Sequence, residues 1–222
     1  DVLERYVQAA ERHGADVVVR INGDCPLVDP QLVDECVRRF KATPLDYFSN
    51  IAPPTYPDGL DIEVVTLAAL QQALRESDKP FDHEHVTPFV RESGLFGSAS
   101  MQNDKDFSAQ RWAVDDAEDF EVISNVFAHF APDIYFGWRQ VLELQHTRPE
   151  IFAANQHIKR NEGAVMGTGQ KLWQRAKRVI PGGNMLLSKR AEMLLPEQWP
   201  AYFSKAKGCR VWDLDGNEYI DM

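Results

Sequence analysis

Acidic side chains follow two apolar runs of the sequence, at points where a strand is expected to end. Asp24 comes soon after the β-branched run at 15–21, which is expected to form a buried strand, and Asp115, with Asp116 directly after it, ends the run at 110–115. Open α/β sheets place ligand-binding groups at the carboxyl ends of their strands. Two such carboxylates could hold one Mg²⁺ ion, which prefers oxygen ligands. The alternative, favoured on spacing alone, is that Asp24 caps a turn and Asp115 caps the helix after it.

A second group of polar residues precedes and begins the next expected strand. Asp61 and Glu63 fall on one face of an alternating run at 60–65, where they could orient a sugar hydroxyl or a second metal ion. Asp58 stands before a glycine, a pair typical of turns, and a turn is the favoured interpretation for it. Arg111 could clamp a phosphate or a carboxylate through its planar fork of donors, although most arginines are solvated.

The elements that would position these residues follow the order helix, strand, loop, helix, which is typical of an α/β fold. Apolar residues at helical spacing predict the helices, and β-branched or alternating runs predict the strands. Helices are expected at 1–13, 30–40, 67–77, 83–91, 117–130 and 138–146, and strands at 15–21, 46–50, 60–65, 96–101 and 110–115.

A change in composition after residue 163 predicts a second unit. The small-residue stretch at 164–169 is interpreted as a linker, and an amphipathic helix is expected over 170–179. Two alternating runs flank Asp215-Gly-Asn217, which predicts a β-hairpin. The expected domain organisation is therefore 1–163, the linker 164–169, and 170–222.

Composition limits the class of protein. The chain has 222 residues, 44% hydrophobic and 26% charged, which is enough apolar material for one domain and part of another. A net charge of -10 makes nucleic acid a poor partner. Three cysteines at no metal-ligand spacing indicate neither a disulfide framework nor a zinc site, and they favour the reducing cytoplasm. No apolar run approaches the roughly 20 residues that cross a bilayer, so no membrane partner is expected.

Residues 1–163 resemble the spore-coat polysaccharide biosynthesis protein F group, which is similar to the CMP-sugar synthetases. The motifs that carry the resemblance are RINGDCPLVD at 20–29, YPDGLDIE at 56–63, EHVTP at 84–88, RWAVDDAED at 111–119 and HIKRNE at 157–162. The resemblance implies an α/β fold, a partial nucleotide-diphospho-sugar transferase (Rossmann-like) fold. It also implies transfer of CMP from CTP to an acidic sugar, with pyrophosphate as the leaving group.

The same resemblance implies roles for particular residues. Asp24 and Asp115 stand in the places of two acids that bind Mg²⁺, and they would be the catalytic metal ligands. On the substrate side it implies contacts from Tyr56, Asp58, Asp61, Glu63 and Arg111. Members of the family begin with a glycine- and basic-rich nucleotide loop that would precede Asp1. The chain is therefore expected to be a fragment that binds CTP poorly and is inactive alone.

Residues 170–222 resemble the start of class III aminotransferases, nearest to glutamate-1-semialdehyde aminomutase. Two motifs carry this resemblance, LWQRAKRVIPGG at 172–183 and AKGCRVWDLDGNEYID at 206–221. The resemblance implies the helix and β-hairpin arm of a fold-type I pyridoxal-phosphate enzyme that forms a homodimer. It implies substrate contacts from Ser188 or Arg190, and it places the pyridoxal-phosphate lysine beyond Met222.

We therefore interpret the chain as the junction of a bifunctional, cytoplasmic sugar-biosynthesis enzyme that joins a cytidylyltransferase to an aminotransferase. Its partners would be nucleotide and sugar small molecules. Two alternatives stay open. One is a scaffold module without catalytic activity, attached to an active aminotransferase. The other is a metal-dependent phosphohydrolase that uses the same acids.

Overall fold

A computed structural model describes residues 1–158, 168–180 and 201–220. The chain divides into two compact units, Asp1–Arg160 and Asn161–Met222.

The first unit is built on a mixed four-stranded sheet with the strand order β1-β3-β2-β4. β3 runs antiparallel to both of its neighbours, and β2 and β4 are parallel. As a result β1, β2 and β4 end, and β3 begins, at the same end of the sheet, which we call its carboxyl end. The strands are β1 (Val17–Arg20), β2 (Tyr47–Ser49), β3 (Glu63–Thr66) and β4 (Ser98–Ser100).

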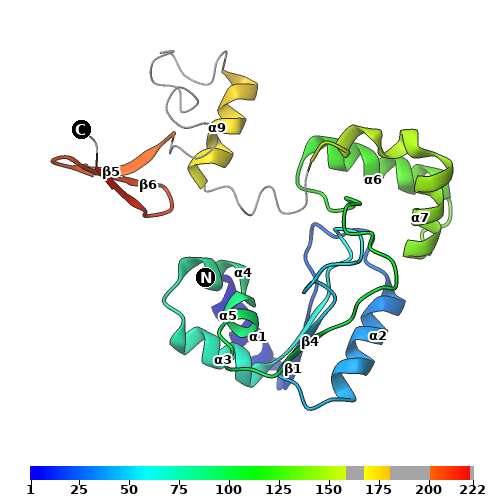
Figure 1. The fold of residues 1–222 in the computed structure, drawn as a ribbon, viewed down its shortest axis with the longest axis horizontal. Coiled ribbons are helices and arrows are strands. Elements are labelled where there is room, and N and C mark those ends of the chain that lie inside the picture. The colour runs from blue at the N-terminus through cyan, green and yellow to red at the C-terminus, as the bar shows by residue number, and fades with distance from the viewer. Residues whose placement is uncertain (159–167, 181–200, 221–222) are drawn as a thin grey trace. The chain divides into compact units, whose positions relative to one another are not determined.

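Helices cover both faces of this sheet (Figure 1). The alternation of side chains along each strand explains the two layers. Tyr47 and Val65 pack with α1 and α3, whereas Phe48 and Val64 pack with α2. On the first face lie α1 (Val2–His13), α3 (Leu67–Glu76), α4 (Pro80–His85) and α5 (Pro88–Glu92), and on the second lies α2 (Pro30–Lys41).

Three further helical segments lie beyond the carboxyl end of the sheet (Figure 1). Their buried apolar side chains join the core cluster that contains Leu32, Cys36 and Phe40 of α2. None of the helices in the described part of the chain is long and apolar enough to cross a membrane. The three segments are α6 (Ala117–Phe130), α7 (Trp138–Thr147) and the 3₁₀ helix η1 (Pro149–Asn155).

Asp29 caps two helices at once. Its Oδ1 accepts the backbone N–H groups of Gln31 (2.8 Å) and Leu32 (3.3 Å) at the start of α2. Its Oδ2 accepts the N–H of Trp138 (2.9 Å) at the start of α7. A helix N-terminus presents unpaired N–H groups and a partial positive charge, so this one buried carboxylate stabilises both helices and fixes them to each other.

The structure corrects the prediction that β1 is a buried strand. β1 is an edge strand of the sheet, so no strand of the described chain pairs with its outer side. Val17 and Val19 are 38% and 39% exposed. The helix predicted over 83–91 is two short helices, because the chain turns sharply at Val86, where φ is 74°.

Two predicted strands near the acidic residues also differ. Residues 110–115 do not form a strand, and only Arg111 makes an isolated bridge, with Asp58. The strand predicted at 60–65 begins at Glu63, so Asp61 lies in the loop before it and not on a shared strand face.

The second unit contains one helix and a three-stranded antiparallel sheet. α9 (Thr168–Val179) begins within the predicted linker, and the hairpin predicted around Asp215-Gly-Asn217 is confirmed. The carboxylate of Asp213 accepts hydrogen bonds from Asn217 and Tyr219 and so holds the turn closed. The predicted substrate contacts Ser188 and Arg190 lie outside the described residues. The strands are β5 (Phe203–Lys207), β6 (Arg210–Asp213) and β7 (Glu218–Ile220).

Candidate active site

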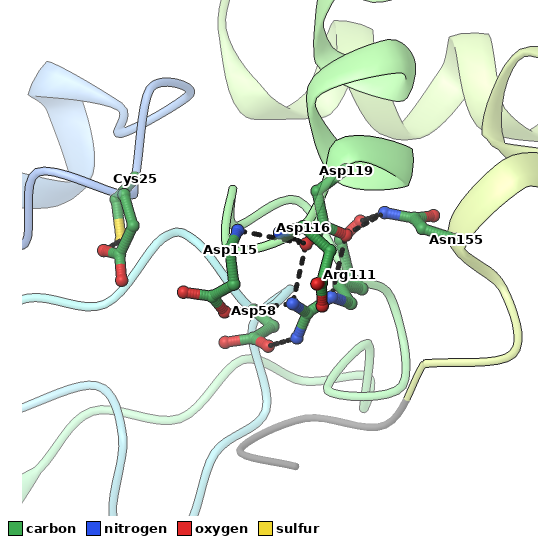
Figure 2. Close-up of polar contacts among 8 residues, drawn as sticks. Cys25, Asp58, Arg111, Asp115, Asp116, Asp119 and Asn155 are labelled. Atoms are coloured by element: carbon green, nitrogen blue, oxygen red, sulfur yellow. Dashed lines mark hydrogen bonds and ion pairs between the residues drawn. The ribbon is translucent and has the colours of Figure 1, made fainter. Parts of the chain in front are cut away.

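Arg111 is the centre of a cluster of charges before α6 (Figure 2). Its Nε donates to Oδ1 of Asp119 over 2.9 Å, and its Nη2 donates to Oδ2 of Asp119 over 2.7 Å. Arg111 is 7% exposed and Asp119 is fully buried. A two-point bond of this kind fixes the orientation of both groups in addition to pairing their charges.

Asp119 is held by more than its ion pair. Its Oδ1 accepts the side-chain amide of Asn155 (2.8 Å), and its Oδ2 accepts the backbone N–H groups of Asp115 and Asp116 (both 3.0 Å). Burial by itself raises the pKa of Asp119, but the hydrogen bonds, that from Arg111 first, outweigh burial and lower the pKa to about 2. The hydrogen bond with Asp119 in turn raises the pKa of Arg111.

Two more carboxylates flank the guanidinium of Arg111. Oδ2 of Asp115 accepts from Nη2 over 2.9 Å, and Oδ2 of Asp58 lies 3.6 Å from Nη1. The Asp58 side chain is buried, whereas the Asp115 side chain is 53% exposed. Counting Asp119, three carboxylates surround one cation, and this excess of negative charge favours a further cation nearby. Asp115 is the carboxylate of the three that is open to solvent.

The turn that carries Asp24 lies against this cluster. The backbone N–H of Val114 donates to the carbonyl oxygen of Asp24 over 2.8 Å, so the turn after β1 is joined directly to the segment that ends in Asp115. In Figure 2 the turn at Cys25 faces Asp115. Cys25 Sγ donates to Oδ1 of Asp24 over 3.4 Å, and burial raises the pKa of this thiol.

The carboxylate oxygens of Asp24 and Asp115 are ligands that suit a hard divalent cation. Asp24 and Asp115 offer carboxylate oxygens from two joined loops, and Mg²⁺ commonly takes one or two protein carboxylates together with water or phosphate oxygens. Within the described ranges, no group of three or more His, Cys, Asp and Glu side chains is arranged to hold a metal. The residues therefore fit a magnesium ion shared with a phosphate-bearing ligand better than one enclosed by protein.

Asp58 is placed by its backbone. Its N–H donates to the carbonyl oxygen of Gln110 (2.8 Å), and its carbonyl oxygen accepts the N–H of Trp112 (2.7 Å). The next residue, Gly59, has φ 101°, and a Cβ there would lie 2.6 Å from the backbone of Trp112 and Ala113. Only glycine allows the two segments to approach this closely, which explains how Asp58 reaches Arg111.

The other predicted site residues lie apart from Arg111. The Asp61 backbone hydrogen-bonds the Cys25 thiol, which places Asp61 near the Asp24 turn. Tyr56 is buried, with its ring 5.6 Å from that of Trp138, and burial raises its pKa. Glu63 is buried and hydrogen-bonded to Arg20, Tyr47 and Thr87. Tyr56 and Glu63 are therefore left out of the site that we propose below.

Sequence reasoning missed Asp119 and Asn155 as parts of the cluster. A signal for Asp119 was present, because an acid three residues after the N-cap Asp116 is the pattern of a capping box. No local pattern pointed to Asn155, whose side chain reaches the cluster from η1, 36 positions from Asp119.

The fold, with Asp24 in the turn after β1 and Asp115 in the loop joined to that turn, defines an α/β domain of the nucleotidyltransferase type. The profile of the cytidylyltransferase family matches residues 1–137, more than half of the chain, and the chain belongs to this family. A solved cytidylyltransferase from Leptospira borgpetersenii superimposes with a TM-score of 0.66 at 29% identity, covering 68% of this chain and 65% of that one. The fold class predicted for the first unit is thereby confirmed.

Curated relatives agree with both resemblances. An uncharacterised protein of Methanocaldococcus jannaschii is 30% identical over 164 residues, 72% of this chain and 65% of that protein. The spore coat polysaccharide biosynthesis protein SpsF of Bacillus subtilis is 29% identical over 139 residues, 60% of this chain and 57% of SpsF. Aminopentol aminotransferase of Sphingopyxis macrogoltabida is 48% identical over 56 residues, 25% of this chain and 13% of that enzyme. The chain thus spans less than two thirds of these relatives.

Proposed function

We propose that the protein containing this chain transfers CMP from CTP to an oxygen of an acidic sugar and releases pyrophosphate. Asp24 and Asp115 would hold the Mg²⁺ ion that this reaction uses. The observation that carries the proposal is the hydrogen bond from Val114 to Asp24, because it brings together the loops of two acids that are far apart in the sequence. Family membership supports CTP as the nucleotide.

When bound, the magnesium ion would neutralise negative charge on the phosphates. The chain's own residues would set the geometry. Arg111 holds one oxygen of Asp115, Oδ2, and is itself fixed by the buried Asp119. Asp115 can therefore offer its carboxylate in one orientation with little reorganisation, which is the arrangement that makes electrostatic stabilisation effective.

The contacts of Arg111 favour a role other than the substrate contact that the resemblance implies. Its guanidinium is occupied by Asp119 and Asp115 and lies close to Asp58. We assign it to positioning Asp115 in place of the direct substrate contact that the sequence predicts. Asp58 and Asp61, on the loop beside Arg111 and Cys25, are the acids that we propose to face the sugar.

We infer that the second unit is the start of a pyridoxal-phosphate aminotransferase. Its helix and β-hairpin fit the arm that the sequence predicts, and the match to aminopentol aminotransferase supports it. In the complete aminotransferase that begins with this unit, Ser188 or Arg190 would contact substrate, and the arm would contribute to a homodimer. The longer protein would then be bifunctional, with one activity that makes an amino sugar and one that activates a sugar with CMP.

The test is release of pyrophosphate from CTP by the full-length protein that contains this chain, with Mg²⁺ and a panel of eight- and nine-carbon acidic sugars. Asp24→Asn and Asp115→Asn are each expected to lower kcat/KM at least 100-fold. The matched control is Asp16→Asn, an exposed acid before β1, which should leave kcat/KM unchanged. Inorganic phosphate in place of pyrophosphate would indicate a phosphohydrolase, and release of neither would indicate a scaffold.

A further inference from the structure

One residue from each of three sequence motifs, none of them assigned to the magnesium site, meets the others at one buried carboxylate. Glu63 is 2% exposed. Its Oε1 accepts the hydroxyl groups of Tyr47 (2.6 Å) and Thr87 (2.5 Å), and its Oε2 accepts from Nη1 of Arg20. Arg20, Glu63 and Thr87 come from the motifs at 20–29, 56–63 and 84–88. Residues far apart in the chain thus converge on a group that does not touch Arg111.

The ion pair between Arg20 and Glu63 lies where the two site loops begin. Arg20, the last residue of β1, pairs with Glu63, the first residue of β3, at the carboxyl end of the sheet. Beyond this pair β1 continues into the turn with Asp24, four residues on, and the chain before β3 contains Asp61, two residues back. The pair therefore joins the two strands at the point from which both segments enter the site.

Within the described ranges Arg20 depends on Glu63 for its position. Its Nε is buried without a hydrogen-bond partner, and the guanidinium is held through Nη1 by Glu63. Removing the Glu63 charge would leave a largely buried cation unpaired at the end of β1. Movement of Arg20 would then pass along the backbone to the turn that follows.

A strained turn positions Thr87, the third side chain that donates to Glu63. Val86 is fully buried with φ 74° and ψ −52°, and the N–H of Thr87 donates to the carbonyl oxygen of His85 over 2.9 Å. This is a γ-turn, in a conformation that is rare and unfavourable for a β-branched residue. Strain of this kind persists only where surrounding contacts maintain it, and here the turn aims the Thr87 hydroxyl at Glu63.

We propose that Glu63 is a positioning residue for the active site. Its carboxylate fixes the carboxyl end of β1 through Arg20, and its backbone fixes the start of β3, so that the Asp24 turn and Asp61 keep their places. The importance of Asp24 in this proposal rests on the proposed function. The positioning itself does not, because it is a statement about which backbone segments Glu63 holds.

Amide hydrogen exchange of the full chain with Glu63→Gln tests the proposal. This variant keeps the size of the side chain and acceptors for Tyr47 and Thr87, but it removes the charge that holds Arg20. We expect the amides of Cys25 and Ile62, bonded to Asn22 and Asn50, to exchange at least tenfold faster. The amides of Asp115 and Asp116, bonded to Asp119, should keep their rates and serve as the internal reference.

The matched control is Glu35→Gln, which removes a carboxylate paired with Arg38 and Arg39 on the exposed side of α2. It should change none of these rates. If Glu63→Gln does not fold, Thr87→Val removes one hydrogen bond to Glu63 and should accelerate the same two amides about threefold. Equal acceleration across the first unit, or no acceleration at Cys25 and Ile62, would overturn the proposal.

Binding of Mn²⁺ to the same variants separates this proposal from the proposed function. If Glu63 holds the Asp24 turn in place and Asp24 binds the metal ion, Glu63→Gln should weaken Mn²⁺ binding about tenfold while the fold is retained. Failure of the wild-type chain to bind Mn²⁺ would count against the proposed function. The exchange pattern would still decide whether Glu63 holds the Asp24 turn.

Discussion

Arg111 and Asp119 form a buried ion pair with two hydrogen bonds, of 2.9 and 2.7 Å, and the carboxylates of Asp58 and Asp115 lie against the same guanidinium. Asp115 and Asp116 donate their backbone N–H groups to the same carboxylate, so the pair also determines how the chain enters α6. The cluster therefore stabilises the fold and orients a candidate metal ligand through the same contacts.

The ion pair between Arg111 and Asp119 predicts how the stability of the fold depends on pH. The pKa of Asp119 is lowered from 3.8 to about 2, so its ionised form stabilises the folded state at every pH above about 4. As pH falls from 4 to 2 the stabilisation is lost, by about 2 kcal/mol. Urea unfolding of the chain at a series of pH values measures this loss.

Asp119→Asn removes the titrating group and one charge of the buried pair. We expect a loss of about 3 kcal/mol at pH 7 and a shallower decline between pH 4 and 2. Asp104→Asn, at an exposed position, is the control and should stay within about 0.5 kcal/mol of wild type. An Asp119→Asn variant as stable as wild type at pH 7 would show that the pair does not hold the cluster.

The double cap at Asp29 predicts that one substitution loosens two helices. Asp29→Ala leaves N–H groups of Leu32 and Trp138 without their acceptor, and we expect a loss of about 2 kcal/mol. Thr66→Ala removes the side-chain cap of one helix only, the bond from the Ala69 N–H at the start of α3, and should cost less than half as much. Equal effects of the two substitutions in thermal unfolding would contradict the double cap.

Gly59 is expected to tolerate no side chain. A Cβ at this position would overlap the backbone of Trp112 and Ala113, and φ is 101°, so Gly59→Ala should cost about 2–4 kcal/mol. It should also separate Asp58 from Arg111. Gly97→Ala, where the nearest atom is 3.6 Å away, is the matched control and should be nearly neutral. Denaturant unfolding of the two variants tests the difference.

The three cysteines should differ in reactivity. Burial raises the pKa of the Cys25 thiol and raises that of Cys36 to about 12, whereas Cys209 is exposed. The thiolate is the reactive form, so a thiol reagent at pH 8 should label one cysteine quickly and the other two only in denaturant. Rapid labelling of Cys25 in the folded chain would show that its turn is not packed as described.

The sequence predicted most of the fold because helices and strands leave local patterns. The helix expected at 117–130 is the helix observed, and the turn with Asp24 follows β1 as expected. Long-range features were not predictable. The exposure of β1 follows from its place in the sheet order, and the shape of the segment at 110–115 follows from its bridge to Asp58.

The candidate site was predictable in part for the same reason. Asp24 and Asp115 stand out as acids at expected strand ends, whereas nothing local shows that Arg111 is surrounded by three carboxylates. From the sequence, Glu63 is an acid in an alternating run that could orient a sugar hydroxyl or a second metal ion. Its burial depends on Arg20, Tyr47 and Thr87, which come from other elements.

We propose that Asp24 and Asp115 hold one divalent cation between their joined loops. The most direct measurement is Mn²⁺ binding followed by electron paramagnetic resonance, on the full-length protein that contains this chain, with and without CTP. We expect one bound ion, and weakening of at least about tenfold in both Asp24→Asn and Asp115→Asn, since each removes a ligand. Asp16→Asn should bind as wild type does. Unchanged Mn²⁺ affinity in either ligand variant would contradict the claim.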